Sequence, residues 1–157
     1  MNLKKIITTL SFLLLLNCGY EPIYSKKQIN SNYNYSINNI NYIGDNKVNQ
    51  ILKNQLQKIL IKEKKSTGLN LNLNSRLEKG ITSKDKKGNP KRFSIEIIIN
   101  LEVYESEILK GKANFDENFE YNNRSNKFDL RKYEKNIQDN LTRKLSDEII
   151  RYLNSLR

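Results

Sequence analysis

The 157-residue sequence contains no histidine and no tryptophan, a single cysteine and two prolines. Without histidine it lacks the base of Ser–His–Asp and Cys–His triads, and without a second cysteine it lacks the usual zinc ligand sets. One cysteine forms no internal disulfide, and no glycine-rich phosphate loop follows any expected strand. These absences argue against a nucleophilic hydrolase, a zinc enzyme and a P-loop protein.

Two pairs of acidic residues are the remaining candidates for catalysis: Glu105 with Glu107, and Asp147 with Glu148. Both pairs fall where a strand or a helix is expected to face solvent, whereas general acid–base chemistry needs groups within reach of one substrate. We therefore expect no enzymatic activity, no metal site and no cofactor.

The first 17 residues are typical of an export signal that does not belong to the fold. Lys4 and Lys5 form a short positive region, and a largely apolar run extends from Ile6 to Leu16. A membrane-spanning helix needs ~20 apolar residues, so this shorter run behind a positive start indicates a secretory signal.

The only cysteine lies directly behind this apolar run. Leu15, Leu16 and Asn17 precede Cys18 in the arrangement that signal peptidase II recognises, although Asn17 replaces the usual small residue before the cut. We predict that Cys18 becomes the lipid-modified first residue of the mature chain; an ordinary signal with a chance cysteine is the alternative. Each buried CH₂ contributes about 0.8 kcal/mol, so two or three acyl chains anchor a protein stably.

Basic residues exceed acidic ones by 28 to 17, a net charge of +11, which loss of Lys4 and Lys5 lowers by two to +9. A basic chain often binds nucleic acid, but an exported protein meets little of it, and we expect no such partner. Two explanations stay open: the lysine and asparagine codons of an AT-rich genome, and attraction to anionic headgroups or phosphorylated glycolipid.

Behind a tether over residues 18–32, one domain is expected over 33–157. Apolar and polar residues alternate from Tyr33 to Ile37 and again at Ile40 and Tyr42, which predicts a first strand. Apolar residues then recur every three or four positions, which predicts an amphipathic helix from about 46 to 64 with Asp45 as its N-cap.

Three further strands are expected. Leucine alternates with asparagine from Leu69 onward to about residue 77 or 81, and the third strand runs from Phe93 to Val103 behind a polar turn over 83–91. The fourth runs from Leu109 through Phe115 and on to Tyr121, with a bulge or bend at residues 116–118.

Asp129 is expected to cap a final helix whose apolar stripe spans ~28 residues, or ~40 Å. The order is therefore strand, helix, three strands, helix. This order predicts an α+β two-layer sandwich, in which a four-stranded mixed sheet carries two helices packed on one face. The first strand–helix–strand unit fits a right-handed parallel crossover.

Residues 18–24 read Cys-Gly-Tyr-Glu-Pro-Ile-Tyr. This start resembles that of the mature LptE-type lipopolysaccharide-assembly lipoproteins, which often open Cys-Gly-Phe-x-Pro-Leu-Tyr; Tyr20 stands for the Phe and Ile23 for the Leu. Length, signal and order of elements resemble that family over most of the mature chain.

The resemblance implies an outer-membrane lipoprotein that sits as a plug in the LptD β-barrel and helps the barrel fold. It also implies that the protein helps lipopolysaccharide pass to the cell surface and can bind lipopolysaccharide itself. Gly19 after the cysteine is compatible with sorting to the outer membrane. No ligand-binding residue of the family can be transferred, because no motif of this chain aligns there.

The densest basic cluster comprises Lys84, Lys86, Lys87, Lys91 and Arg92, at one tip of the expected sheet. Phosphates of lipid A are natural partners of ammonium and guanidinium groups. We take this cluster as a hypothetical contact for lipopolysaccharide or for the barrel; the alternative is a solvated hairpin tip.

Two other functions stay open. One is another small outer-membrane lipoprotein, such as an accessory subunit of a barrel-assembly machine or a secretin pilot. The other, from a different class, is a periplasmic small-ligand-binding protein or hydrolase, which would need a concave pocket with convergent polar groups.

Overall fold

Six elements follow one another in the order that the sequence predicts. A computed structural model describes residues 36–57 and 68–156, which belong to one compact unit. The export signal, Cys18 and the tether lie outside these residues. The elements are β1 (Ile37–Gly44), α2 (Asn46–Leu56), β2 (Leu69–Lys84), β3 (Pro90–Glu105), β4 (Ile108–Asn122) and α3 (Lys127–Ser155).

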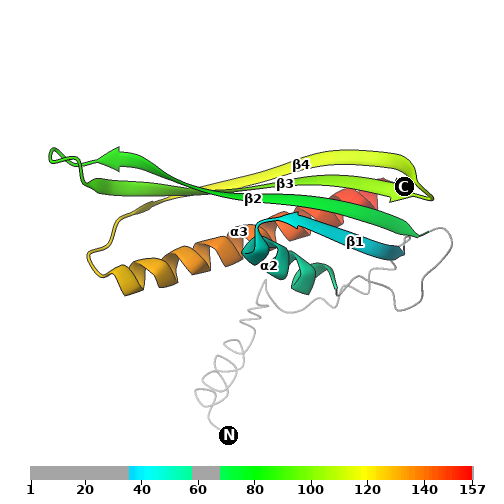
Figure 1. The fold of residues 1–157 in the computed structure, drawn as a ribbon, viewed down its shortest axis with the longest axis horizontal. Helices are drawn as coiled ribbons and strands as arrows, with labels where there is room; N and C mark the ends of the chain where they lie inside the picture. The colour runs from blue at the N-terminus through cyan, green and yellow to red at the C-terminus, as the bar shows by residue number, and fades with distance from the viewer. Residues whose placement is uncertain (1–35, 58–67, 157) are drawn as a thin grey trace, which may run out of the picture. The chain divides into compact units, whose positions relative to one another are not determined.

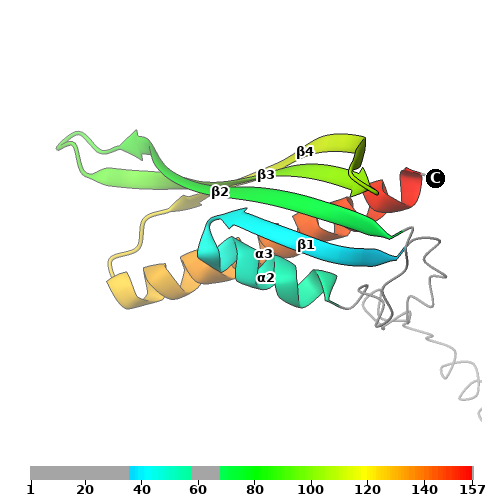
Figure 2. The same cartoon turned by 45° about the vertical axis from the view of Figure 1, so that its right-hand side comes forward.

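The four strands form one mixed sheet in the order β1-β2-β3-β4. β1 pairs with β2 in parallel, and β2, β3 and β4 pair antiparallel through two hairpins. Both helices lie on one face of this sheet, with α2 and α3 packed against each other (Figure 1). The view in Figure 2 shows the same two layers from another side. The α+β two-layer sandwich is therefore confirmed.

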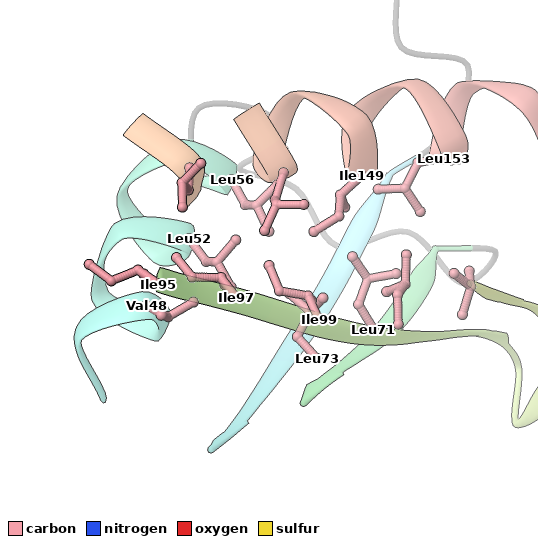
Figure 3. Close-up of a cluster of buried hydrophobic side chains, with 14 of the residues drawn as sticks. Val48, Leu52, Leu56, Leu71, Leu73, Ile95, Ile97, Ile99, Ile149 and Leu153 are labelled. Atoms are coloured by element: carbon pink, nitrogen blue, oxygen red, sulfur yellow. The ribbon is translucent and has the colours of Figure 1, made fainter. Parts of the chain in front are cut away.

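Strict alternation along the strands places the core between sheet and helices. In β3, every second residue from Ile95 to Val103 is buried, and α2 and α3 supply the opposing leucines and isoleucines (Figure 3). Full burial of such a side chain contributes about 1.5–3 kcal/mol. The fully buried members with the largest side chains include Leu52, Leu56, Leu71, Leu73, Ile97, Ile99, Leu145, Ile149 and Leu153.

A tight turn joins β1 to α2. Gly44 has a φ of +99°, and Asp45 then caps α2 as predicted, since its carboxylate accepts hydrogen bonds from the backbone N–H groups of Lys47 (2.9 Å) and Val48 (3.0 Å). The described part of α2 ends at Leu56. The rest of the helix expected to residue 64 falls within 58–67, outside the described residues.

The predicted cap of α3 is wrong. Asn126 is the N-cap, and its side-chain oxygen accepts hydrogen bonds from the N–H groups of Phe128 (2.9 Å) and Asp129 (3.4 Å). Asp129 lies in the first turn instead, where the negative charge of a carboxylate interacts favourably with the positive end of the helix dipole. The expected apolar stripe is confirmed and faces the sheet from Leu130 to Leu153.

The interruption expected in β4 is also wrong. Residues 116–118 pair in continuous register with 96–98 of β3, and the pairing shifts only between Val103 and Tyr104. The ladder with β3 holds these residues extended, and Glu117 points to the helix side, where it forms an ion pair with Lys144 of α3. Asp116 and Asn118 face the other way, so three polar residues in a row keep the strand's alternation.

Candidate functional site

The β2–β3 hairpin carries the predicted basic cluster, with Lys86 and Lys87 in its turn and the other three residues at the strand ends. The turn has five residues and is shorter than the 83–91 turn expected from the sequence. The Asp85 carboxylate organises this turn, because it accepts hydrogen bonds from the N–H groups of Lys87 (2.8 Å) and Asn89 (2.9 Å) and from the Asn89 amide (3.1 Å). The bonds from Asn89, above all that of its side chain, hold the pKa of Asp85 below its ordinary value. One carboxylate therefore stays charged within the cluster.

All five predicted basic residues are exposed, but they do not form a single surface. Lys84, Lys86 and Lys87 lie at the hairpin tip. Arg92 lies on the sheet face away from the helices, where its guanidinium is 3.7 Å from the carboxylate of Glu120. Lys91 lines a hollow beside the loop that leads from β4 to α3.

This hollow joins Lys91 to two cations far away in the sequence. It has a volume of about 270 Å³, and Arg124 and Lys127 lie at its wall. Asn123 ties the two segments together, since its side-chain amide donates to the carbonyl of Pro90 (2.8 Å) and its backbone N–H to that of Lys91 (2.8 Å). We call this site, in which the cations Lys91, Arg124 and Lys127 lie beside the Asp85 carboxylate, the basic hollow.

Sequence reasoning missed Arg124 and Lys127. They lie just after β4 and more than thirty residues along the chain from the β2–β3 turn. Only the antiparallel pairing of β3 and β4 brings them back beside that turn. A signal was available: the loop after an antiparallel fourth strand must return to the end of the sheet where the β2–β3 turn lies.

Aromatic rings lie beside the basic hollow. The Arg124 guanidinium lies 4.0 Å from the centre of the Tyr133 ring, which meets the Tyr121 ring edge-on at 6.0 Å. The Tyr121 hydroxyl donates to Glu134 (2.8 Å), and burial, followed by this bond, raises its pKa. The Tyr133 ring thus holds the Arg124 guanidinium beside the basic hollow, and no ion pair with an acidic side chain is seen for it within residues 36–57 and 68–156.

A second feature is the sheet face that no helix of the described residues covers, here called the open face. Asn74, Asn100 and Asn114 lie side by side across β2, β3 and β4, and all three are exposed. In the neighbouring row, the carboxylate of Glu102 forms an ion pair with the ammonium group of Lys112 (Oε1 to Nζ, 2.6 Å), and the hydrogen bond from Lys112 lowers the pKa of Glu102. The open face is thus largely polar, and its row of three amides ends at β1 with Ile43, which pairs with Asn74 and is 52% exposed.

No group of acidic, histidine or cysteine side chains able to hold a metal ion occurs in residues 36–57 and 68–156. Neither of the two described helices is long and apolar enough to cross a membrane.

No protein family matches the chain by sequence, and no characterised protein does. The fold, however, is similar to that of solved bacterial lipoproteins. Rare lipoprotein B from Shewanella oneidensis has a TM-score of 0.55 at 11% identity, with 76% of this chain and 98% of that chain covered.

Two further solved structures are similar in fold. A minor lipoprotein from Acinetobacter baumannii has a TM-score of 0.58 at 8% identity, covering 77% of this chain and 93% of that chain. A lipoprotein B from Nitrosomonas europaea has a TM-score of 0.54 at 9% identity, covering 77% and 84%. At these identities the likeness shows a shared fold, which spans nearly the whole length of the first two proteins.

Proposed function

We propose that this chain is a lipoprotein of the LptE type, anchored in the outer membrane through Cys18, that plugs an LptD-like β-barrel and assists its folding and lipopolysaccharide transport. It acts by binding and not as an enzyme. The observation that carries the proposal is the conjunction of a lipoprotein fold with a polar open face.

The anchor and the fold support each other. The signal followed by Cys18 predicts a lipid-modified chain, and the solved structures with the same fold are bacterial lipoproteins. The opening motif after Cys18 resembles that of LptE-type proteins. The fold and the motif both favour a bacterial lipoprotein, and the motif adds the likeness to the LptE type.

The open face suits a barrel lumen. The interior of a large outer-membrane barrel is polar, and a plug within it needs a rigid, polar surface. Side-chain amides both donate and accept hydrogen bonds, so the row Asn74–Asn100–Asn114 can pair with either kind of group on a barrel wall.

The basic hollow suits an amphiphilic phosphate. Its three cations adjoin an end of the sheet where large apolar side chains are exposed: Ile81 (50%), Phe119 (42%) and Phe128 (67%). Cations beside exposed apolar groups match the chemistry of a phosphorylated glycolipid. Lipopolysaccharide is therefore the ligand that we propose for this end.

The open face is tested with Asn74→Asp and Asn114→Asp together. These positions flank β3, so the added charges lie about 9–10 Å apart and do not face each other directly. The matched control is Asn136→Asp with Asn154→Asp, which adds the same charge at exposed positions of α3.

The readout is the amount of LptD-like barrel recovered with each variant from solubilised outer membrane. We expect the open-face pair to lose most of the barrel, because buried unpaired carboxylates oppose association, and the control to retain it. Equal recovery with both variants contradicts the proposed role of this face.

A further inference from the structure

A groove runs between α2 and α3 on the helical layer, on the side of the sheet opposite the open face, and its Arg131 lies one helical turn after Lys127 of the basic hollow. Its volume is about 700 Å³, within the range of ligand-binding clefts. Residues spaced by three and four positions line it from both sides, so each helix contributes one continuous stripe. We call it the helix groove.

Four cations line the helix groove: Lys47 of α2, and Arg131, Lys135 and Arg143 of α3. None of their side chains forms an ion pair or hydrogen bond with another described residue. Arg131 and Lys135 are four residues apart on α3, where like charges repel. The pair therefore adds no stability to the fold, and its two charges are available to attract an anionic ligand.

Acidic residues in the helix groove do not balance these cations. Glu134 is already engaged, since it accepts hydrogen bonds from Lys79 and the Tyr121 hydroxyl. Asp139 is the one other carboxylate at the groove wall among the described residues. The helix groove thus presents a surplus of positive charge.

The remaining lining identifies the chemistry of the ligand. The amides of Gln50, Asn54 and Gln138 lie among the cations and can donate to and accept from a peptide backbone. Val48, which is buried, and Ile51, which is half-buried, are the apolar side chains at the groove wall, and an acyl chain would need more exposed apolar surface than these two offer. The large exposed apolar side chains of the described residues are Ile43, Ile81, Ile108, Leu109, Phe119 and Phe128, and none of them lines the helix groove.

The spacing of the cations sets the length of the ligand. Arg131 and Arg143 are twelve positions apart, or ~18 Å along α3 at ~1.5 Å per residue. An extended peptide covers that distance in about five residues at ~3.3 Å each.

We propose that the helix groove binds an acidic polypeptide segment of about five residues, whose carboxylates pair with Lys47, Arg131, Lys135 and Arg143 while the groove amides hold its backbone. The helix groove shares no lining residue with the basic hollow or with the row of amides on the open face. The proposal for the helix groove does not depend on whether the barrel is the chain's partner.

The test uses the full chain purified in non-ionic detergent and a fluorescein-labelled hexaglutamate peptide, with binding followed by fluorescence anisotropy. Hexaglutamine is the neutral comparison. The groove variant carries Arg131→Gln, Lys135→Gln and Arg143→Gln, since glutamine keeps the helix propensity of the original residues. The control variant carries Lys84→Gln, Lys86→Gln and Lys87→Gln, an equal loss of charge at the hairpin tip.

We expect hexaglutamate to bind and hexaglutamine not to bind. The groove variant should lose affinity by about tenfold or more and the tip variant by less than about twofold. Circular dichroism on both variants verifies the fold. Absence of hexaglutamate binding, or an equal loss in both variants, overturns the proposal. So does binding of phosphatidylglycerol-containing micelles through the groove cations in place of hexaglutamate, because the ligand is then a lipid.

Discussion

At the residue scale, two tyrosine hydroxyls are withdrawn from water in different ways. The Tyr121 hydroxyl is bonded to Glu134, whereas that of Tyr42 is buried without a hydrogen-bond partner in the described part of the chain. An unpartnered buried polar group costs stability. We expect Tyr42→Phe to raise the free energy of unfolding by about 1 kcal/mol in urea titrations at neutral pH. A loss of stability would show that this hydroxyl has a partner.

The same two side chains predict an alkaline loss of stability. Burial raises the pKa of Tyr42 from 10.0 to about 12, and burial with the bond to Glu134 raises that of Tyr121. The folded state therefore keeps these protons above pH 10, where the unfolded state releases them, so stability falls as pH rises.

Urea midpoints between about pH 9 and about pH 11 check this expectation. The variant with Tyr42→Phe and Tyr121→Phe separates the tyrosines from the lysines, which also titrate in this range. Its midpoint should fall less steeply than that of the parent chain. Parallel slopes would mean that the tyrosines do not carry the effect.

Gly44 and Gly88 both have positive φ values, +99° and +84°, but differ in their surroundings. A Cβ at Gly44 would lie 1.8 Å from the carbonyl oxygen of Ser75, while at Gly88 it would meet nothing within 4 Å. We expect Gly44→Ala to destabilise the fold by about 3 kcal/mol or more, and Gly88→Ala by about 1–2 kcal/mol from strain alone. Thermal unfolding measures both; similar losses would contradict the close approach.

At the scale of elements, the start of α3 gives a direct comparison of two acidic or amide side chains. Asn126→Ala should cost about 1 kcal/mol, because two backbone N–H groups lose their acceptor. Asp129→Ala should cost only about 0.5 kcal/mol, since it interacts with the helix dipole alone. Urea unfolding of the two variants checks the order, and the reverse order would restore Asp129 as the cap.

Periodicity predicted the elements because burial on one side dictates it. The alternation from Ile95 to Val103 and the stripe from Leu130 to Leu153 needed no tertiary knowledge. The interruption predicted in β4 was wrong because the outcome there depended on tertiary structure. Residues 116–118 stay in β4 because they pair with residues 96–98 of β3, a pairing that only the assembled sheet supplies.

The candidate site was predicted in part for the same reason. The basic residues of the hairpin were visible as a run in the sequence. The basic hollow was not, because Lys91 meets Arg124 and Lys127 only through the return of β4. The helix groove likewise depends on two helices that the sheet brings together.

At the scale of the whole molecule, the three surfaces suit different neighbours. The open face is largely polar and carries a row of amides beside Ile43, the basic hollow combines cations with exposed apolar groups, and the helix groove combines cations with amides and two apolar side chains. With a lipid at Cys18, such a chain would be held at the membrane while its folded domain contacts partners on several sides.

The central claim is that this chain is the lipid-anchored partner of an outer-membrane barrel. Its most direct test is affinity purification of the tagged chain from solubilised outer membrane, with the recovered proteins identified and quantified. The account predicts an LptD-like barrel in stoichiometric amounts. Recovery of a different barrel or of a secretin, or a mature chain without lipid at Cys18, would contradict it.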